Sequence, residues 1–208
     1  SGILEVASKR LELFPKHAKL YIERSKALSD LDRHEEALDD AKKAVDMGYK
    51  GKKTWYRMAW SSYMLDRYDD AIRYKKLHYD SCDAPGAETA ARHLVRLWQW
   101  SRAGRLDAER EAVQARIAEA AADPEKTDQA WLKIKFLNGD VTGDELIECY
   151  SKGKKEGQRP SCAHYMVGIK HLYDRGDPWR ALVAFEESVR LCEAQESDCG
   201  AAKHEAAP

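Results

Sequence analysis

The sequence predicts an all-α fold, a solenoid of antiparallel helix pairs, on two observations. Residues 31–38 (LDRHEEAL) recur 34 positions later as residues 65–72 (LDRYDDAI). No segment of consequence shows the alternating apolar pattern of a β-strand. A period of about 20–50 residues is typical of repeats that bury their apolar faces only by stacking on neighbours. We therefore expect stacked helix pairs with a long concave surface suited to binding.

The first segment, residues 1–17, is predicted to be the second helix of a repeat whose first helix is missing. Ala7 lies 34 positions before Ala41, and Pro15 lies 34 positions before Tyr49. From this register, and from the Ser-Gly start, we expect the chain to be a fragment of a longer protein.

Two complete repeats are predicted over residues 18–85. The first complete repeat covers residues 18–51, and Gly48 stops its second helix. The second covers residues 52–85 and ends at the Pro85-Gly86 break.

Three further segments follow. Residues 86–123 are predicted to be a divergent pair, with helices over 87–103 and 106–122. Residues 124–195 are predicted to be a helical module whose last helix starts after Asp177, because Asp is a favourable N-cap and Pro178 fits the first turn. Shorter helices are expected in that module at 126–137, 144–151 and 164–174. Residues 196–208 are predicted to be a polar tail.

Residues 18–85 resemble the tetratricopeptide repeat family. Equivalent positions of the two repeats carry matching aromatic or small residues, namely Tyr21 and Trp55, Ser25 and Ala59, and Ala37 and Ala71. The resemblance implies a right-handed superhelical solenoid in which the first helix of each repeat lines the concave face. Lys75 and His78 stand where the family prefers apolar or small residues. The second helix of that repeat is therefore expected to be shifted or more exposed.

The C-terminal part resembles a module of bacterial tetratricopeptide lipoproteins of the NlpI type. The residues that carry this resemblance are Trp131, the LNGD segment at 137–140, Asp144-Glu145-Leu146, Cys162-Ala163-His164-Tyr165, Gly168, Gly176-Asp177, Ala181 and Phe185. The resemblance implies a bacterial source, an envelope location and an adaptor that brings enzymes to substrates.

The cysteines number five and are irregularly spaced, at positions 82, 149, 162, 192 and 199. In a helical repeat protein most are expected to be small buried hydrophobes, and all are expected to be reduced. Cys192 and Cys199 are the pair best placed to reach each other. Cysteine usage favours the cytoplasm, whereas the lipoprotein resemblance favours the periplasm or envelope.

The composition limits the partners and the chemistry. The 208 residues include 35 basic and 36 acidic side chains, so nothing favours nucleic acid or an anionic membrane. No apolar run approaches the roughly 20 residues of a membrane-spanning helix. His78 and Cys82 are one helical turn apart, but no second pair completes a zinc site. No phosphate loop or nucleophile motif occurs. We therefore expect a protein without enzymatic activity, a bound metal ion or a cofactor.

The predicted binding site is the concave face. Glu23 and Lys26 come from the first complete repeat, and Tyr56, Arg57, Trp60 and Tyr63 come from the second, with Trp98 extending the surface. Aromatic and Arg side chains are typical of binding hot spots. The alternative is that these aromatic rings pack in the core or in a dimer interface. The lysines at 52 and 53 are assigned to a solvated loop.

The sequence therefore predicts a non-enzymatic adaptor that presents a preformed concave face to a peptide or a partner protein. One alternative is a structural scaffold that self-associates through the same aromatic surface. Another is a regulatory or targeting domain of a larger enzyme. A clamp for a chaperone tail is disfavoured, because such clamps use asparagines and the single asparagine, Asn138, lies outside both complete repeats.

Overall fold

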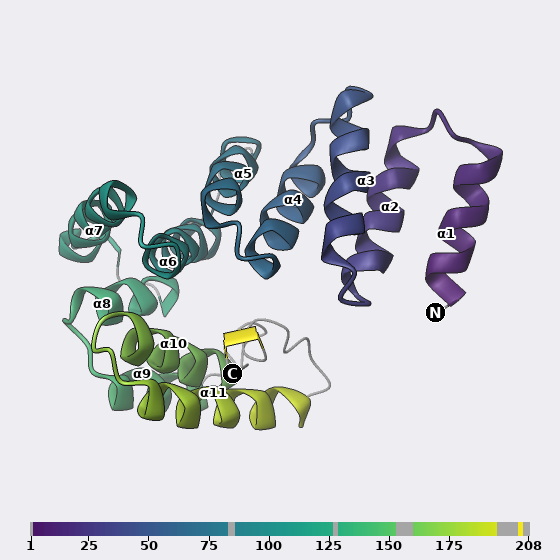
Figure 1. Cartoon of the computed structure of the whole chain (residues 1–208). Coiled ribbons are helices and arrows are strands. Elements are labelled where there is room, and N and C mark those ends of the chain that lie inside the picture. Colours follow the sequence, from purple (N-terminus) through teal and green to yellow (C-terminus); the bar gives the residue numbers. More distant parts are fainter. Residues whose placement is uncertain (1, 83–85, 127–128, 153–159, 195–203, 206–208) are drawn as a thin grey trace. The chain divides into compact units, whose positions relative to one another are not determined.

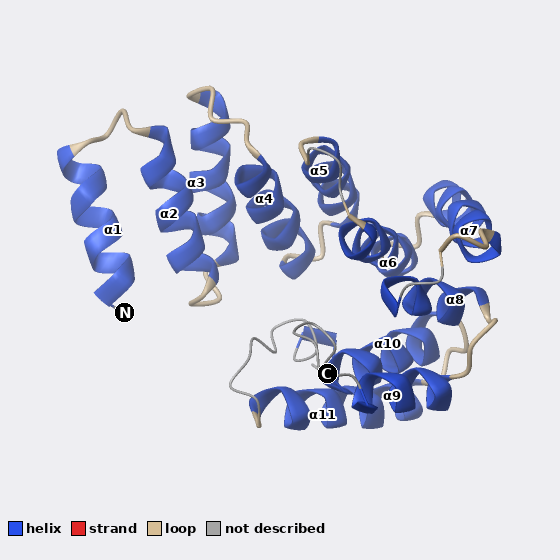
Figure 2. Cartoon of the chain, turned by 180° about the vertical axis from the view of Figure 1, so that it is seen from behind, coloured by secondary structure: helices blue, strands red, loops and turns tan. Residues whose placement is uncertain are grey.

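The computed structural model describes residues 2–82, 86–126, 129–152, 160–194 and 204–205. These residues form helices joined by short loops, and none of them lies in a strand (Figure 2). The predicted class, an all-α fold of stacked helix pairs, is confirmed for these residues.

The chain divides into two compact units, of which the first comprises Ser1–Gly86 and Ala103–Asp107. Its helices are α1 (Gly2–Leu13), α2 (Ala18–Ser29), α3 (His34–Asp46), α4 (Lys52–Met64) and α5 (Tyr68–Asp80). They lie side by side in chain order, each packed on the next (Figure 1).

The second unit comprises Ala87–Arg102 and Ala108–Pro208. Its elements are α6 (Ala87–Ala103), α7 (Asp107–Ala122), the 3₁₀ turn η1 (Gln129–Trp131), α8 (Leu132–Asn138), α9 (Gly143–Lys152), α10 (Pro160–Tyr173) and α11 (Pro178–Glu193). The Asp177 carboxylate accepts a hydrogen bond from the Arg180 backbone N–H, which caps α11 as the sequence predicts.

The first unit repeats its backbone at the spacing of the sequence. Helices α4 and α5 begin 34 residues after α2 and α3. The two turns also match, because Asp32 has φ 57° and Asp66 has φ 56°, a left-handed conformation that the short polar Asp side chain tolerates. The expected shift of α5 is therefore wrong, and Lys75 is buried rather than exposed.

Small side chains allow the helices of each pair to approach closely. Ala37, Ala41 and Ala71 have no exposed surface. Ser25 is also fully buried, and its hydroxyl donates a 2.7 Å hydrogen bond to the Ala37 carbonyl on the facing helix. This bond satisfies a polar atom that would otherwise be costly to bury. The small residues of the repeat pattern are thus packing positions.

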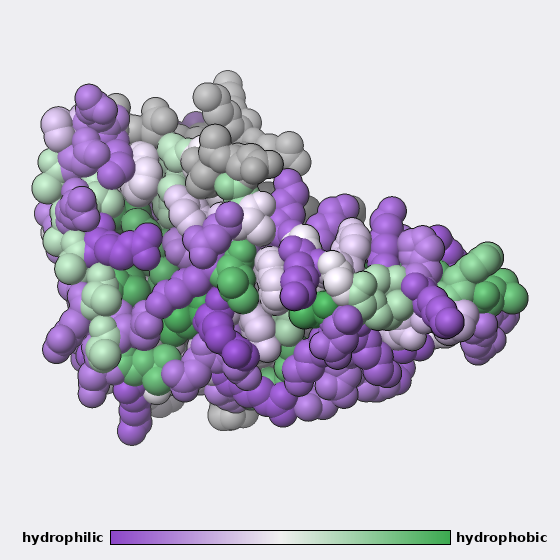
Figure 3. Space-filling view, turned by 90° about the horizontal axis from the view of Figure 1, so that it is seen from above, coloured by the Kyte–Doolittle hydropathy of each residue, from purple (hydrophilic) through white to green (hydrophobic). Residues whose placement is uncertain are grey.

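Helix α1 is covered on one face only. Ala7 and Leu11 are buried and α1 packs on α2, while four apolar side chains remain outside. The exposed fractions are 72% for Ile3, 58% for Val6, 73% for Leu13 and 59% for Phe14. Hydrophobic surface is visible at the α1 end of the molecule, at the right in Figure 3. We call these four residues the α1 stripe.

In the second unit, polar contacts tie α6 to later elements. The Arg96 guanidinium donates to the Tyr165 hydroxyl of α10 at 3.1 Å. Lys133 of α8 and Glu88 of α6 form an ion pair at 3.1 Å. The apolar core beside these contacts includes Leu97 and Trp98 of α6, which have no exposed surface.

The state of the cysteines differs from the expectation. Cys192 is disulfide-bonded, so the prediction that all thiols are reduced is wrong. Cys82, Cys149 and Cys162 are free, and Cys199 lies outside the described residues. The sequence did not predict this bond, because the spacing of the cysteines does not show which of them lie close together in space. It also does not show the redox environment of the protein.

Replacement of Gly168 by Ala should destabilise the second unit. A Cβ atom there would lie 2.5 Å from Cε1 of the Phe185 ring. Overpacking of this kind costs about 1–3 kcal/mol, which urea unfolding would measure. Phe185→Leu creates room, so the double variant should lose less than the two single losses added together. Additive losses would contradict the close packing.

The free thiols should number three in the protein denatured without reductant, and five after reduction. Reaction with a chromogenic disulfide reagent under both conditions gives the count. Cys192→Ser should leave four reactive thiols without reductant, because its former partner is released. Five thiols in the unreduced protein would contradict the disulfide.

Candidate functional site

The first unit contains a groove between α2 and α4 with a volume of about 540 Å³. Its lining residues are Lys19, Ile22, Glu23, Lys26, Tyr49, Lys52, Lys53, Tyr56, Arg57 and His78. We call this the α2–α4 groove. It lies entirely within one compact unit.

The repeat register builds this groove. Helices α2 and α4 are the first helices of neighbouring repeats and contact each other. Lining residues therefore occur in equivalent pairs 34 residues apart, namely Lys19 and Lys53, Ile22 and Tyr56, and Glu23 and Arg57. Positions i, i+3 and i+4 share one face of a helix. Two helices thus present the same face to the same hollow.

The apolar part of the groove centres on Tyr56, whose side chain is 42% exposed. Its ring centroid lies 5.6 Å from that of His78, and the Arg57 guanidinium carbon lies 5.4 Å from the ring. Ile22, in contrast, is buried. The groove therefore presents an exposed aromatic ring held by two neighbouring side chains.

His78 is held as a neutral ring at the α5 side of the groove. Its Nδ1 lies 2.9 Å from the Lys52 carbonyl oxygen, which can only accept, so Nδ1 carries the proton. Burial lowers the pKa of His78 below its usual 6.5, and the charges of Lys75 and Lys52 lower that pKa further. Near neutral pH His78 therefore adds an aromatic surface and no charge.

The charge of the groove is unbalanced. Five cationic side chains line it, together with a single carboxylate, that of Glu23. Arg10 already occupies this carboxylate, with Nη1 2.6 Å from the Glu23 Oε2 atom. Within the described part of the chain, no ion pair involves the lysines at positions 19, 26, 52 and 53. A carboxylate-bearing ligand would find these cations available.

The structure brings four of the predicted site residues together, and their role in binding stays a prediction. Glu23, Lys26, Tyr56 and Arg57 all line the groove. Trp60 does not line it, and this half-buried ring lies 5.5 Å from that of Tyr63.

Two predicted contact residues are buried, and their assignment to a binding surface is wrong. Tyr63 has no exposed surface and packs with its ring centroid 6.3 Å from that of Tyr68. Trp98 also has no exposed surface, and the guanidinium of Arg102 covers its ring at 4.1 Å. Both rings therefore belong to the packed core, which is the alternative that the sequence left open.

Sequence reasoning missed part of the lining. Lys52 and Lys53 open helix α4 and face the groove, although they were expected in a solvated loop. The signal that identifies Lys53 is the repeat itself, because Lys53 stands 34 residues after Lys19. The signal for His78 is its departure from the family pattern.

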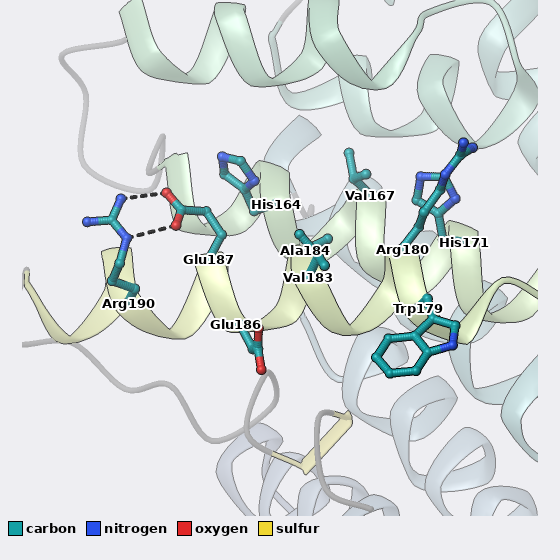
Figure 4. A pocket seen from close by; sticks show the side chains of 10 residues that line it. All are labelled: His164, Val167, His171, Trp179, Arg180, Val183, Ala184, Glu186, Glu187 and Arg190. Atoms are coloured by element: carbon teal, nitrogen blue, oxygen red, sulfur yellow. Dashed lines mark hydrogen bonds and ion pairs between the residues drawn. The ribbon is translucent and has the colours of Figure 1, made fainter.

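A second hollow, of about 760 Å³, lies along α10 and α11 (Figure 4). We call this the α10–α11 groove. Trp179 and Val183 of α11 are 76% and 64% exposed. In Figure 4 Trp179 lies on the opposite side of α11 from His171. This groove is the larger of the two and also offers an exposed aromatic ring.

The charges of the α10–α11 groove are balanced internally. Arg190 forms two hydrogen bonds with the Glu187 carboxylate, at 2.7 and 2.5 Å. Arg180 has Asp177 as an ion-pair partner at 3.5 Å. Burial lowers the pKa of His164, which keeps it neutral near pH 7. This groove offers a ligand little uncompensated charge.

The described ranges lack two other kinds of feature, a metal-binding cluster and a membrane-spanning helix. These residues contain no group of three or more His, Cys, Asp or Glu side chains placed to hold a metal ion. None of their helices combines the length and apolar character required to cross a bilayer.

Among known proteins, similarity is found to solved structures and not to sequences. No protein-family model matches the sequence, and no curated protein matches it. The chain is similar to the crystal structure of YrrB, described as a TPR protein with an unusual peptide-binding site. The alignment has 16% identity over 97% of each chain and a TM-score of 0.48. At that level the peptide site of YrrB does not locate a site in this chain, and the lipoprotein resemblance stays a prediction.

Proposed function

We propose that this chain is a non-enzymatic protein-interaction module that holds a polypeptide segment of a partner in the α2–α4 groove. The observation that supports it most is the lining, in which repeat-equivalent residues of two helices face one hollow around the exposed Tyr56. A groove presented by helices that are already packed needs little ordering when a ligand binds, which favours affinity.

The lining favours binding over catalysis. It contains no Ser, Thr or Cys that could act as a nucleophile. Its one carboxylate, Glu23, is paired with Arg10, and the His78 Nδ1 is engaged by a backbone carbonyl. A nucleophile beside a base, which covalent catalysis requires, does not occur among these lining residues.

A second candidate function is self-association, and the α1 stripe favours it. Its members are spaced by 3, 7 and 1 residues along the chain, which places Ile3, Val6 and Leu13 on one face of the helix. Exposed apolar patches of this kind mark interaction surfaces in soluble proteins.

The Tyr56→Ala/Arg57→Ala variant should lose binding to peptides selected by the wild type. Peptides from a random library displayed on phage would be selected and then measured by fluorescence anisotropy. We expect a loss of at least about tenfold, because truncating hot-spot residues costs on the order of 2 kcal/mol.

The matched control is Trp179→Ala/Arg180→Ala, which removes the same kinds of side chain from the α10–α11 groove. It should keep the wild-type affinity, and both variants should keep their helical circular dichroism, because Tyr56 and Trp179 are exposed. Equal affinities for the wild type and the Tyr56/Arg57 variant would refute the groove as the site.

For self-association, the average mass in light scattering should rise with protein concentration. Ile3→Ser/Leu13→Ser should remain monomeric, because it removes two of the most exposed members of the α1 stripe. Trp179→Ser/Val183→Ser, equally exposed, is the control that should still associate. A monomeric wild type at every concentration would exclude this function.

A further inference from the structure

We infer that the segment held in the α2–α4 groove is acidic, an internal stretch whose Asp and Glu side chains meet the groove lysines. This inference rests on the proposed function and names the chemistry of its ligand. The occupant follows from charge complementarity, because the groove carries five cationic side chains and one carboxylate.

The cations are available in the free protein. The lysines at 19, 26 and 53 are exposed, and no ion pair with a described carboxylate engages them. Like charges gathered in one hollow repel each other, and this repulsion is stronger beside protein than in bulk water. An anionic ligand relieves the repulsion and gains charge-assisted hydrogen bonds.

The spacing of the cations suits an extended chain. Lys19 and Lys26 are seven residues apart on α2, so their Cα atoms are separated by about 10 Å at 1.5 Å per residue. A peptide in the extended polyproline II conformation has three residues per turn and rises about 3.1 Å per residue, so acidic residues at positions i and i+3 lie on one side and span about the same distance. An apolar or aromatic residue between them would reach Tyr56.

A nucleic acid fits the same observations less well. The groove lysines form one short cluster, while the whole chain has a formal net charge of −1. Nucleic-acid surfaces need cations that follow a long phosphate backbone. The Glu23 carboxylate of the groove would also repel the phosphates of a nucleic acid. An acidic peptide segment avoids this repulsion by placing a neutral residue opposite that carboxylate.

Glu23 supplies a test in which affinity should increase. Its carboxylate is the one negative side chain of the lining, and its ion pair with Arg10 is at the surface. Surface ion pairs contribute little to stability, so Glu23→Gln should fold normally. The substitution removes a repulsion and also releases the guanidinium of Arg10. A residue with a purely structural role would not produce tighter binding when replaced.

The experiment compares two synthetic peptides, each blocked at both ends. One is a short segment with Glu at positions i and i+3 around an aromatic residue, and the other has Gln in place of each Glu. Fluorescence anisotropy at low and at high salt gives the affinity of each peptide for the protein. The proteins compared are the wild type, Glu23→Gln, Lys19→Gln/Lys53→Gln and the control Lys16→Gln/Lys42→Gln. The control removes the same charge from outside the groove.

We expect the affinity for the acidic peptide to exceed that for the Gln peptide by at least about tenfold. High salt should reduce this difference in affinity. Lys19→Gln/Lys53→Gln should remove the preference, the control should keep it, and Glu23→Gln should strengthen acidic binding. Equal affinity for both peptides, lost in Tyr56→Ala/Arg57→Ala, overturns the acidic ligand and leaves the proposed function standing. Binding of neither peptide, when library-selected peptides bind the groove, also overturns it.

Two further outcomes separate the remaining possibilities. If neither these peptides nor any library peptide binds through the groove, the proposed function itself fails. A single-stranded oligonucleotide that displaces the acidic peptide at equal charge concentration would show a general polyanion site, which overturns the inference in favour of nucleic acid.

Discussion

The close packing of small residues between paired helices is the constraint on which the first unit depends. Ala37 and Ala71 have no exposed surface, and Ser25 hydrogen-bonds across the pair. Because such positions tolerate little added volume, they fix how α3 and α5 pack on the first helices of their repeats. That packing keeps the 34-residue register, and the register brings α2 and α4 into contact. The α2–α4 groove is thus a consequence of packing.

Much of the fold could be predicted because its signals are local and repeated. The period of 34, the helix stops and the Asp177-Pro178 start of α11 each act within a few residues of the chain. The burial of an aromatic ring is a different kind of property. Tyr56 and Tyr63 stand on the same helix, yet one is 42% exposed and the other fully buried. Seven residues make almost two full turns, so both rings leave α4 on nearly the same side, and Tyr63 is buried because it packs against the rings of Trp60 and Tyr68.

The parts of the site that the sequence missed depend on contacts between distant residues. His78 reaches the groove because α5 packs on α4 and because its ring bonds the Lys52 carbonyl, 26 residues away. The disulfide of Cys192 was missed for a similar reason, since distance in the chain does not reveal distance in space. Lys53, in contrast, could have been found from the sequence, because it stands 34 residues after Lys19 and carries the same charge.

Comparison of the two grooves shows why exposure alone does not designate a site. The α10–α11 groove is larger, and Trp179 is more exposed than Tyr56. Its Arg190, however, already has the Glu187 carboxylate as a partner, and a ligand would have to break that pair or ignore it. In the α2–α4 groove, Lys26 has no carboxylate partner among the described residues, so a carboxylate ligand gains its hydrogen bonds without displacing an existing one. Uncompensated charge beside an exposed ring therefore distinguishes the α2–α4 groove as the proposed site.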